Sequence, residues 1–200
     1  MIFVGTSGFQ YDDWVGPYYP ADLEKKDWLS FYSKEFNTLE INYTYYRPPT
    51  ARTLASMAQR VPAGFSFTVK ATQEMTHGRS RDKGAFAEFR NALAPLQEQS
   101  KFGAVLAQFP SSFHALDESR DYLEWFREQL PGLPIVVEFR NKGWLTPATY
   151  EFLKGQEFGF CGVDEPFFPR VAEVTSPIAY VRFHGRNAAK WWTHDQAYER

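Results

Sequence analysis

The sequence predicts an α/β fold of the TIM-barrel type, and three observations lead to this prediction. Short runs of β-branched and aromatic residues alternate with amphipathic helical patterns along the whole chain, which is typical of parallel strands joined by right-handed crossovers. The connections lack the short turn signals of hairpins. Several strands also carry apolar residues on one face and charged residues on the other, as expected where the inward face lines a barrel lumen.

Seven segments have the composition and period of strands. A complete TIM barrel has eight strands and about 250 residues. Seven strands in 200 residues therefore predict a barrel that lacks its last β/α unit, which we favour over a barrel left open with its first and seventh strands as exposed edges. The seven segments are Ile2–Thr6, Thr38–Thr44, Phe65–Ala71, Gly103–Phe109, Ile135–Arg140, Gly159–Asp164 and Ile178–His184.

Five segments between these strands have helical patterns. In the second of them, Leu54 and Met57 fall on one stripe, as in a helix with one buried face. The last has Pro147 in its first turn, where proline is tolerated. The segment after Asp164 is rich in proline, so we expect an irregular connection there. The five predicted helices are Asp22–Phe36, Thr50–Val61, Lys83–Gln99, Ser119–Leu130 and Thr146–Lys154.

The charged strand faces distinguish a barrel from an open sheet. An open, doubly wound sheet is covered by helices on both faces, so charged residues within its strands would be costly. The turn GTSGF (5–9) also lacks the G-x-G-x-x-G and P-loop patterns of nucleotide-binding sheets. A barrel instead directs such side chains into its lumen. We expect the following even-numbered side chains to meet at its C-terminal mouth: Glu40, Lys70, Glu138, Arg140, Asp164, Arg182 and His184.

The composition indicates a single soluble domain over residues 1–200, with 44% apolar and 23% charged residues. A net charge of −2 provides no general attraction for nucleic acid or an anionic membrane. No apolar run is long enough to span a membrane, and the amino terminus lacks a secretory pattern. Cys161 is the only cysteine, which excludes an internal disulfide and favours a cytoplasmic location. We expect its thiol to pack on the outward face of its strand.

Six stretches of the sequence carry a family resemblance. They span nearly the whole chain, and several are long enough to make chance agreement improbable. They are GTSGF (5–9) with Tyr11, Trp14 and Tyr19–Pro20; FNTLEINYTYYRPP (36–49); FTVKA with Met75–His77 (67–77); AQFPSSF (107–113); EFRNKGW (138–144); and VRFHGRN (181–187). With these motifs the chain resembles the YecE-like family, domain of unknown function 72.

The resemblance implies a TIM barrel, in agreement with the strand pattern. It also implies that the chain is incomplete at its C-terminal end, because family members continue through another helix and a last strand with an asparagine-rich motif. Family members often carry histidine after the arginine of EFR, where this chain has Asn141. The family has no settled activity, so the resemblance implies the fold rather than a reaction.

The charged lumen predicts an enzyme, of hydrolase or lyase type, that acts on a small phosphate- or carboxylate-bearing ligand. Arg140 and Arg182 would bind the anion, since guanidinium groups match oxyanions bidentately. Glu138 or His184 would transfer a proton. Lys70 would stabilise negative charge. The candidate catalytic residues are Glu138, His184, Lys70, Glu40 and Asp164; the candidate substrate-binding residues are Arg140, Arg182, Asn42, Gln108, Tyr45, Thr6, His77, Trp144 and Asn187.

Three alternatives stay open from the sequence. The carboxylates and histidine could hold a divalent metal in a phosphodiesterase or nucleic-acid-processing barrel, although the interleaved cations oppose this and the basic stretch HGRSRDK (77–83) is modest. The chain could be a non-catalytic binding protein. The charges could also form a purely structural ion-pair network. We expect no cofactor outside the metal alternative and no membrane partner, and we make no prediction of oligomeric state.

Overall fold

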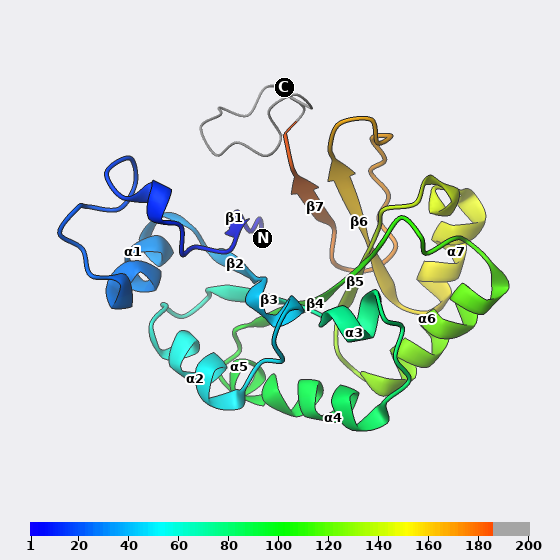
Figure 1. The fold of residues 1–200 in the computed structure, drawn as a ribbon, viewed down its shortest axis with the longest axis horizontal. Helices are drawn as coiled ribbons and strands as arrows, with labels where there is room; N and C mark the ends of the chain where they lie inside the picture. Colours follow the sequence, from blue (N-terminus) through cyan, green and yellow to red (C-terminus); the bar gives the residue numbers. More distant parts are fainter. Residues whose placement is uncertain (186–200) are drawn as a thin grey trace. The chain divides into compact units, whose positions relative to one another are not determined.

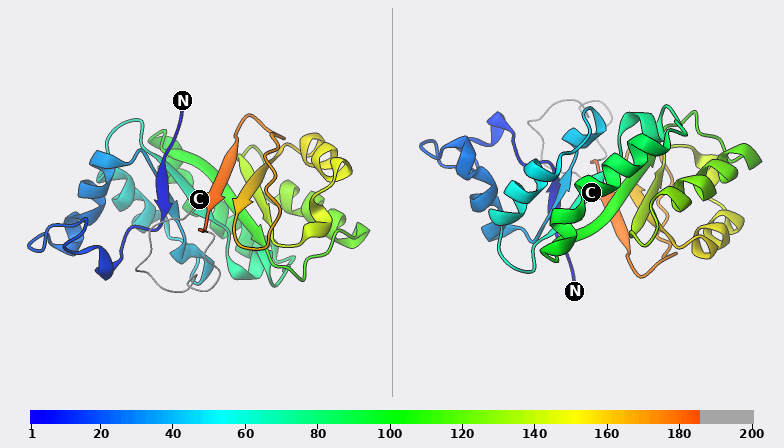
Figure 2. Two further views of the ribbon diagram at one scale, coloured as in Figure 1. Left: turned by 90° about the horizontal axis from the view of Figure 1, so that it is seen from above. Right: turned by 90° about the horizontal axis from the view of Figure 1, so that it is seen from below.

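The computed structural model describes residues 1–185. The chain forms two compact units, Met1–Val105 and the part that begins at Leu106. Strand β4 (Phe102–Phe109) passes from the first unit into the second. The strands are hydrogen-bonded in chain order, from β1 to β7 (Figure 1, Figure 2). This confirms the predicted α/β fold, with seven strands in the order of a TIM-type barrel and no eighth strand among residues 1–185.

The first unit alternates short strands with helices that cover one face of the sheet. Parallel pairing joins β1 to β2 and β2 to β3. Its elements are β1 (Gly5–Ser7), η1 (Asp12–Trp14), η2 (Lys25–Asp27), α1 (Trp28–Glu35), β2 (Thr38–Ile41), η3 (Tyr43–Tyr45), α2 (Ala51–Gln59), β3 (Ser66–Lys70), α3 (Gln73–Thr76), α4 (Lys83–Ala92) and α5 (Ala94–Glu98).

Local chemistry explains where the helices of this unit begin and end. The Thr50 hydroxyl caps α2 by accepting from the Thr53 N–H, and the Asp82 carboxylate caps α4. The predicted single helix Lys83–Gln99 is wrong, because the structure has two helices that meet at Leu93. Pro95, in the first turn of α5, cannot donate an N–H to a continuous helix and would clash with the preceding turn.

The second unit contains the end of β4 and three further strands. Parallel pairing joins β5 to β6 and β6 to β7. Its elements are α6 (Asp117–Gln129), β5 (Ile135–Phe139), η4 (Lys142–Trp144), α7 (Pro147–Gly155), β6 (Phe158–Asp164) and β7 (Tyr180–Phe183). The connection between β6 and β7 contains no helix, as its proline content predicts. Thr175 attaches this connection to β6: its hydroxyl accepts from the Phe160 N–H and donates to the Phe158 carbonyl oxygen.

Stacked aromatic rings fill the core of the second unit. The Phe139 ring, on the outward face of β5, lies 4.4 Å from the Trp144 ring and nearly parallel to it. Phe113 stacks on Trp144 at 5.4 Å and on Phe109 at 4.3 Å. Such rings bury large apolar areas. They hold the outward face of β4 and β5 in place, and thereby fix which side chains of these strands face the other way. No helix among residues 1–185 combines the length and hydropathy needed to cross a membrane.

A glycine substitution tests the packing of β1 on β2. A side-chain methyl at Gly5 would overlap the Thr38 carbonyl oxygen, a backbone atom of the paired strand that cannot rotate away. We expect Gly5→Ala to lower the free energy of unfolding by about 3 kcal/mol in a denaturant titration. Gly155→Ala is the control, because Gly155 ends α7 with open space around it. This variant should be unchanged or up to about 1 kcal/mol more stable. Equal unfolding midpoints for the two variants would contradict the described strand pairing.

Candidate functional site

The Glu138 carboxylate is the centre of the candidate site. It lies on β5 and is completely buried, with an exposed fraction of 0%. The Arg140 Nε donates to Glu138 Oε1 at 2.5 Å, and the Arg182 guanidinium donates to Oε2 at 2.6 Å. Each carboxylate oxygen is therefore paired with a guanidinium group from a different strand end, β5 and β7.

Arg140 connects this pair to two further groups. One of its terminal nitrogens is paired with the Glu165 carboxylate, and the other lies 3.0 Å from the His184 Nε2. The His184 backbone N–H donates to the Asp164 carbonyl oxygen at 2.9 Å, which holds the histidine at the end of β7. We call these five residues, Glu138, Arg140, Glu165, Arg182 and His184, the Glu138 cluster.

Strand register explains why the cluster converges. Val137 is aligned with Phe160 and Val163 with Arg182. Continuing the first alignment by one residue places Glu138 beside Cys161. Side chains two residues apart on a strand share a face, so Cys161 and Val163 lie on the same face of β6. Arg182, which is aligned with Val163, therefore lies on the same face of the sheet as Glu138. The prediction that Glu138, Arg140, Arg182 and His184 meet is therefore confirmed by their contacts.

The same register corrects two predictions for β6. Odd-numbered residues of β6 lie beside even-numbered residues of β5, so Cys161 faces the cluster and Asp164 does not. The Cys161 Sγ lies 4.0 Å from Glu138 Oε2, which contradicts the predicted outward orientation of this thiol. The Asp164 carboxylate instead pairs with Arg170 at 3.3 Å. The prediction that Asp164 lies beside Glu138 is therefore wrong.

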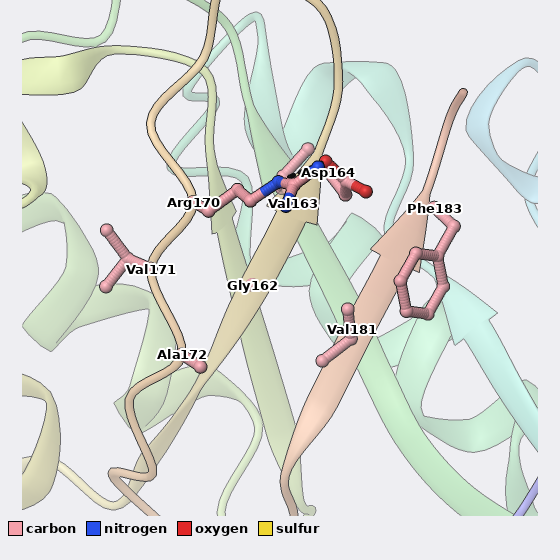
Figure 3. A pocket seen from close by; sticks show the side chains of 8 residues that line it. All are labelled: Gly162, Val163, Asp164, Arg170, Val171, Ala172, Val181 and Phe183. Carbon is pink, nitrogen blue, oxygen red and sulfur yellow. Dashed lines mark ion pairs between the residues drawn. The ribbon is translucent and has the colours of Figure 1, made fainter. Parts of the chain in front are cut away.

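A separate pocket lies on the opposite face of β6 and β7 (Figure 3). Its volume is about 750 Å³. Val181 and Phe183, which flank Arg182 on the strand, are 50% and 69% exposed there. The pocket is lined by Gly162, Val163, Asp164, Arg170, Val171, Ala172, Val181 and Phe183.

Burial and charge move the pKa values of the two cluster carboxyls in opposite directions. Burial tends to raise the pKa of Glu138, but the Arg182 and Arg140 guanidinium groups outweigh it and hold the pKa below the ordinary 4.5. Burial raises the pKa of Glu165 above 4.5, and the neighbouring negative charge of Glu138 adds to this effect against the opposing charge of Arg140. Glu138 therefore stays ionised, whereas Glu165 is the more readily protonated carboxyl.

The sequence interpretation missed Glu165. It directly follows β6, at the strand end where TIM-barrel enzymes place their chemistry, and this position is the signal that could have identified it.

The predicted strand face of Gln108 is confirmed. Phe109, its neighbour, packs against Tyr122 and Phe126 of α6, so Gln108 lies on the other face of β4.

In the first unit, Glu40 and Asn42 contact the end of β1. The Ser7 hydroxyl donates to Glu40 Oε1 at 2.8 Å, and the Asn42 amide donates to the same hydroxyl. Thr6 lies on the other face of β1, because it is aligned with Leu39 and its backbone N–H and hydroxyl both contact the Tyr32 hydroxyl of α1. Its hydroxyl donates to the Gly8 carbonyl oxygen at 2.5 Å. Ser7 is the β1 side chain on the face of Glu40.

Lys70, Tyr45 and His77 form a second group in the first unit. The Lys70 Nζ lies 4.8 Å from the centroid of the Tyr45 ring, and the His77 ring meets that ring edge-on at 5.1 Å. Burial lowers the pKa of His77, and the positive charge of Lys70 lowers it further. The structure thus brings together three residues that were predicted from separate segments.

Trp144 is a core residue. Its exposed fraction is 0%, and its indole N–H donates to the Phe113 carbonyl oxygen at 2.7 Å. The predicted contact with a ligand is therefore wrong for Trp144, since the buried indole stacks on Phe113 and Phe139 and lies 5.7 Å from the Arg120 guanidinium. The remaining predicted binding residue, Asn187, lies outside the described residues. Within residues 1–185, no group of three or more His, Cys, Asp or Glu side chains is arranged to hold a metal ion.

Comparison with known proteins identifies the family. The sequence profile described as "Protein of unknown function DUF72" matches residues 3–200. The chain belongs to the DUF72 family. This confirms the predicted membership of the YecE-like family, domain of unknown function 72. The DUF72 chain is also 32% identical to the UPF0759 protein YunF of Bacillus subtilis (strain 168), in a match that covers 98% of this chain and 74% of YunF.

Two solved DUF72 structures share the fold. The DUF72 family protein TM1631 of Thermotoga maritima MSB8 has a TM-score of 0.86 and 37% identity, over 98% of this chain and 78% of that chain. The DUF72 family protein EF0366 of Enterococcus faecalis V583 has a TM-score of 0.75 and 31% identity, over 82% of this chain and 71% of that chain. These matches support the α/β architecture and the family.

Removing the Glu138 charge tests the electrostatics of the cluster. Because its pKa is depressed, ionised Glu138 stabilises the fold above its ordinary pKa of 4.5, and this contribution is lost as the pH falls through the lower folded value. We expect Glu138→Gln to lower the free energy of unfolding at pH 7 by about 3–5 kcal/mol. The difference from wild type should shrink below pH 4.5.

Glu151→Gln is the matched control, because Glu151 forms an exposed pair with Lys154 at 2.7 Å. We expect a change of less than about 1 kcal/mol for this variant. A Glu138→Gln effect no larger than that of the control, in urea titrations at pH 7, would contradict the ion-pair arrangement.

Proposed function

We propose that the Glu138 cluster is the active site of an enzyme that acts on a small phosphate- or carboxylate-bearing ligand. The single observation that carries the proposal is the orientation of two guanidinium groups, from Arg140 and Arg182, by one fully buried carboxylate. Guanidinium groups held in fixed positions are well suited to bind an oxyanion. The site lies at the C-terminal ends of β5, β6 and β7, the usual location of chemistry in this fold class.

Fold stability alone does not explain why charged side chains, rather than apolar ones, occupy this part of the sheet. Ordinary barrel interiors are filled by layers of branched apolar side chains. A buried ion pair is often no more stabilising than apolar residues of the same volume. Ionisable groups with shifted pKa values, gathered at one strand edge, instead support a binding or catalytic role.

Glu165 suggests how an anion could enter. Its carboxylate pairs with Arg140 and so holds a position that a ligand carboxylate or phosphate could take. Protonation of Glu165, which its raised pKa favours, weakens that pair and releases an Arg140 nitrogen. In this proposal the ligand anion replaces Glu165 on Arg140, and the displaced carboxyl stays beside the bound ligand.

Proton transfer is assigned to Glu165 and His184. Both contact Arg140 and so would lie next to an anion bound there. Histidine ordinarily exchanges protons near neutral pH, and burial moves the pKa of the Glu165 carboxyl upwards, towards that range. Glu138 has the opposite character, because its depressed pKa keeps it charged; its role is to orient the two arginines. Cleavage by proton transfer beside a bound anion fits a hydrolase- or lyase-type reaction.

Neither runner-up gains a specific observation from the described residues. The metal-dependent phosphodiesterase would need a set of ligating side chains that residues 1–185 do not bring together. A non-catalytic binding protein would use the same arginines, so turnover rather than affinity distinguishes it from an enzyme. Cys161 is buried and is the only cysteine of the chain, so no internal disulfide can form, which supports the proposal of a cytoplasmic location.

Anion binding is tested with inorganic phosphate. We expect phosphate to raise the thermal unfolding midpoint of the wild-type chain, because a ligand that binds only the folded state stabilises it. Arg140→Gln and Arg182→Gln should lose most of this shift. Arg170→Gln is the control, since Arg170 pairs with Asp164 on the opposite face and should retain it. A wild-type midpoint that phosphate does not move would overturn the proposed anion site.

The role of Glu165 is tested by the pH dependence of sulfate binding, since sulfate keeps its charge over the range used. In the wild-type chain, affinity should rise as the pH falls from 8 through the raised pKa of Glu165, because this carboxyl becomes protonated and releases Arg140. Glu165→Gln removes the competing carboxylate, so it should bind sulfate about tenfold more tightly at pH 8. It should also show a flatter pH profile in titration calorimetry. Identical profiles for the two proteins would remove Glu165 from the proposal.

A further inference from the structure

A tight turn directly follows the proposed active-site residue Glu165. The Phe168 N–H donates to the Glu165 carbonyl oxygen at 3.4 Å, so residues 165–168 form a β-turn. Pro166 is the second residue of this turn. Phe167, the third, has a positive φ of 62°. Proline followed by a residue with positive φ is the pattern of a type II turn, and glycine or asparagine normally occupies that third position.

Phe167 is unfavourable at this position in two respects. A phenylalanine in the left-handed region is strained by its own Cβ, whereas a glycine is not. The ring also gains nothing from burial, because Phe167 is 86% exposed. Local backbone preference and apolar burial therefore both favour another residue. Strain of this kind is frequently found at functional sites, where it holds a side chain in a working position.

The location of the ring supplies the functional connection. Phe167 is two residues from Glu165, so their Cα atoms are at most about 7 Å apart. The Glu165 side chain contacts Arg140, one of the two groups proposed to bind the anion. The turn therefore places an exposed aromatic residue two positions along the chain from a side chain of the proposed anion site.

We infer that Phe167 is a ligand-contacting residue and that the ligand carries a ring next to its anionic group. The phenyl ring would pack against the ligand ring while Arg140 and Arg182 bind the phosphate or carboxylate. Aromatic side chains pack well against flat or ring-shaped ligands, and they do so with little loss of conformational freedom. This inference rests on the proposed function. It narrows the ligand class from any small anion to ring-bearing anions.

The test compares inorganic phosphate, methyl phosphate and phenyl phosphate by titration calorimetry. The wild-type chain should bind phenyl phosphate about tenfold more tightly than methyl phosphate. Phe167→Gly should keep its affinity for methyl phosphate and lose the preference for the phenyl compound. The same variant should unfold at a higher denaturant concentration than wild type, because glycine relieves the strain. A residue with a purely structural role would not combine a gain in stability with a loss of ligand preference.

Two further variants make the outcome decisive. Phe167→Asn also tolerates a positive φ, and it should reproduce the binding behaviour of the glycine variant. Phe183→Ala removes another exposed ring, 69% exposed and on the opposite face of β7, and should leave the preference unchanged. Equal wild-type affinity for methyl and phenyl phosphate, or an unchanged preference in both Phe167 variants, would overturn the inference while leaving the anion site intact. If the wild-type chain binds none of the three phosphates, the proposed function fails and the inference fails with it.

Discussion

The buried charge of Glu138 is the constraint on which the candidate site depends. A carboxylate with no solvent exposure is tolerable only if it is paired and hydrogen-bonded. Arg140 and Arg182 satisfy one oxygen each, and they reach the carboxylate from the ends of β5 and β7. The Glu138 side chain therefore links the end of β5 to β7 through its two ion pairs. Arg140, held in this way, directs its remaining nitrogens at Glu165 and His184.

This arrangement gives two glutamates of one cluster different chemical characters. Glu138 is surrounded by positive charge and has a depressed pKa, so it acts as a fixed anion. Glu165 is buried near that anion and has a raised pKa, so it is the carboxyl able to change its protonation state. The division resembles the general pattern in which one carboxyl organises a site and another exchanges protons. Membership of the DUF72 family identifies relatives with the same fold, whereas the proposed reaction class rests on the chemistry of the cluster.

The first unit shows the same strand chemistry with different partners. Ser7, Glu40 and Asn42 are linked by hydrogen bonds at the ends of β1 and β2, and Lys70 lies over the Tyr45 ring. The outward faces of these strands pack on helices, as the interaction of Thr6 with the Tyr32 hydroxyl illustrates. In each unit considered by itself, polar side chains gather on one face of the strands, whereas aromatic and apolar side chains occupy the other.

The sequence by itself determined the α/β alternation, the seven strands, and the faces of Glu40, Lys70, Glu138 and Arg182, because these depend on local periodicity and on the cost of burying charge. Only the tertiary structure decided the register between β5 and β6, which places Cys161 rather than Asp164 beside Glu138. Alternation within a strand gives the relative faces of its own residues, whereas the match between two strands depends on their hydrogen bonding and on the packing of both. For the same reason, the burial of Trp144 and the contact between Glu165 and Arg140 could not be inferred from spacing, since both depend on how separate segments pack together.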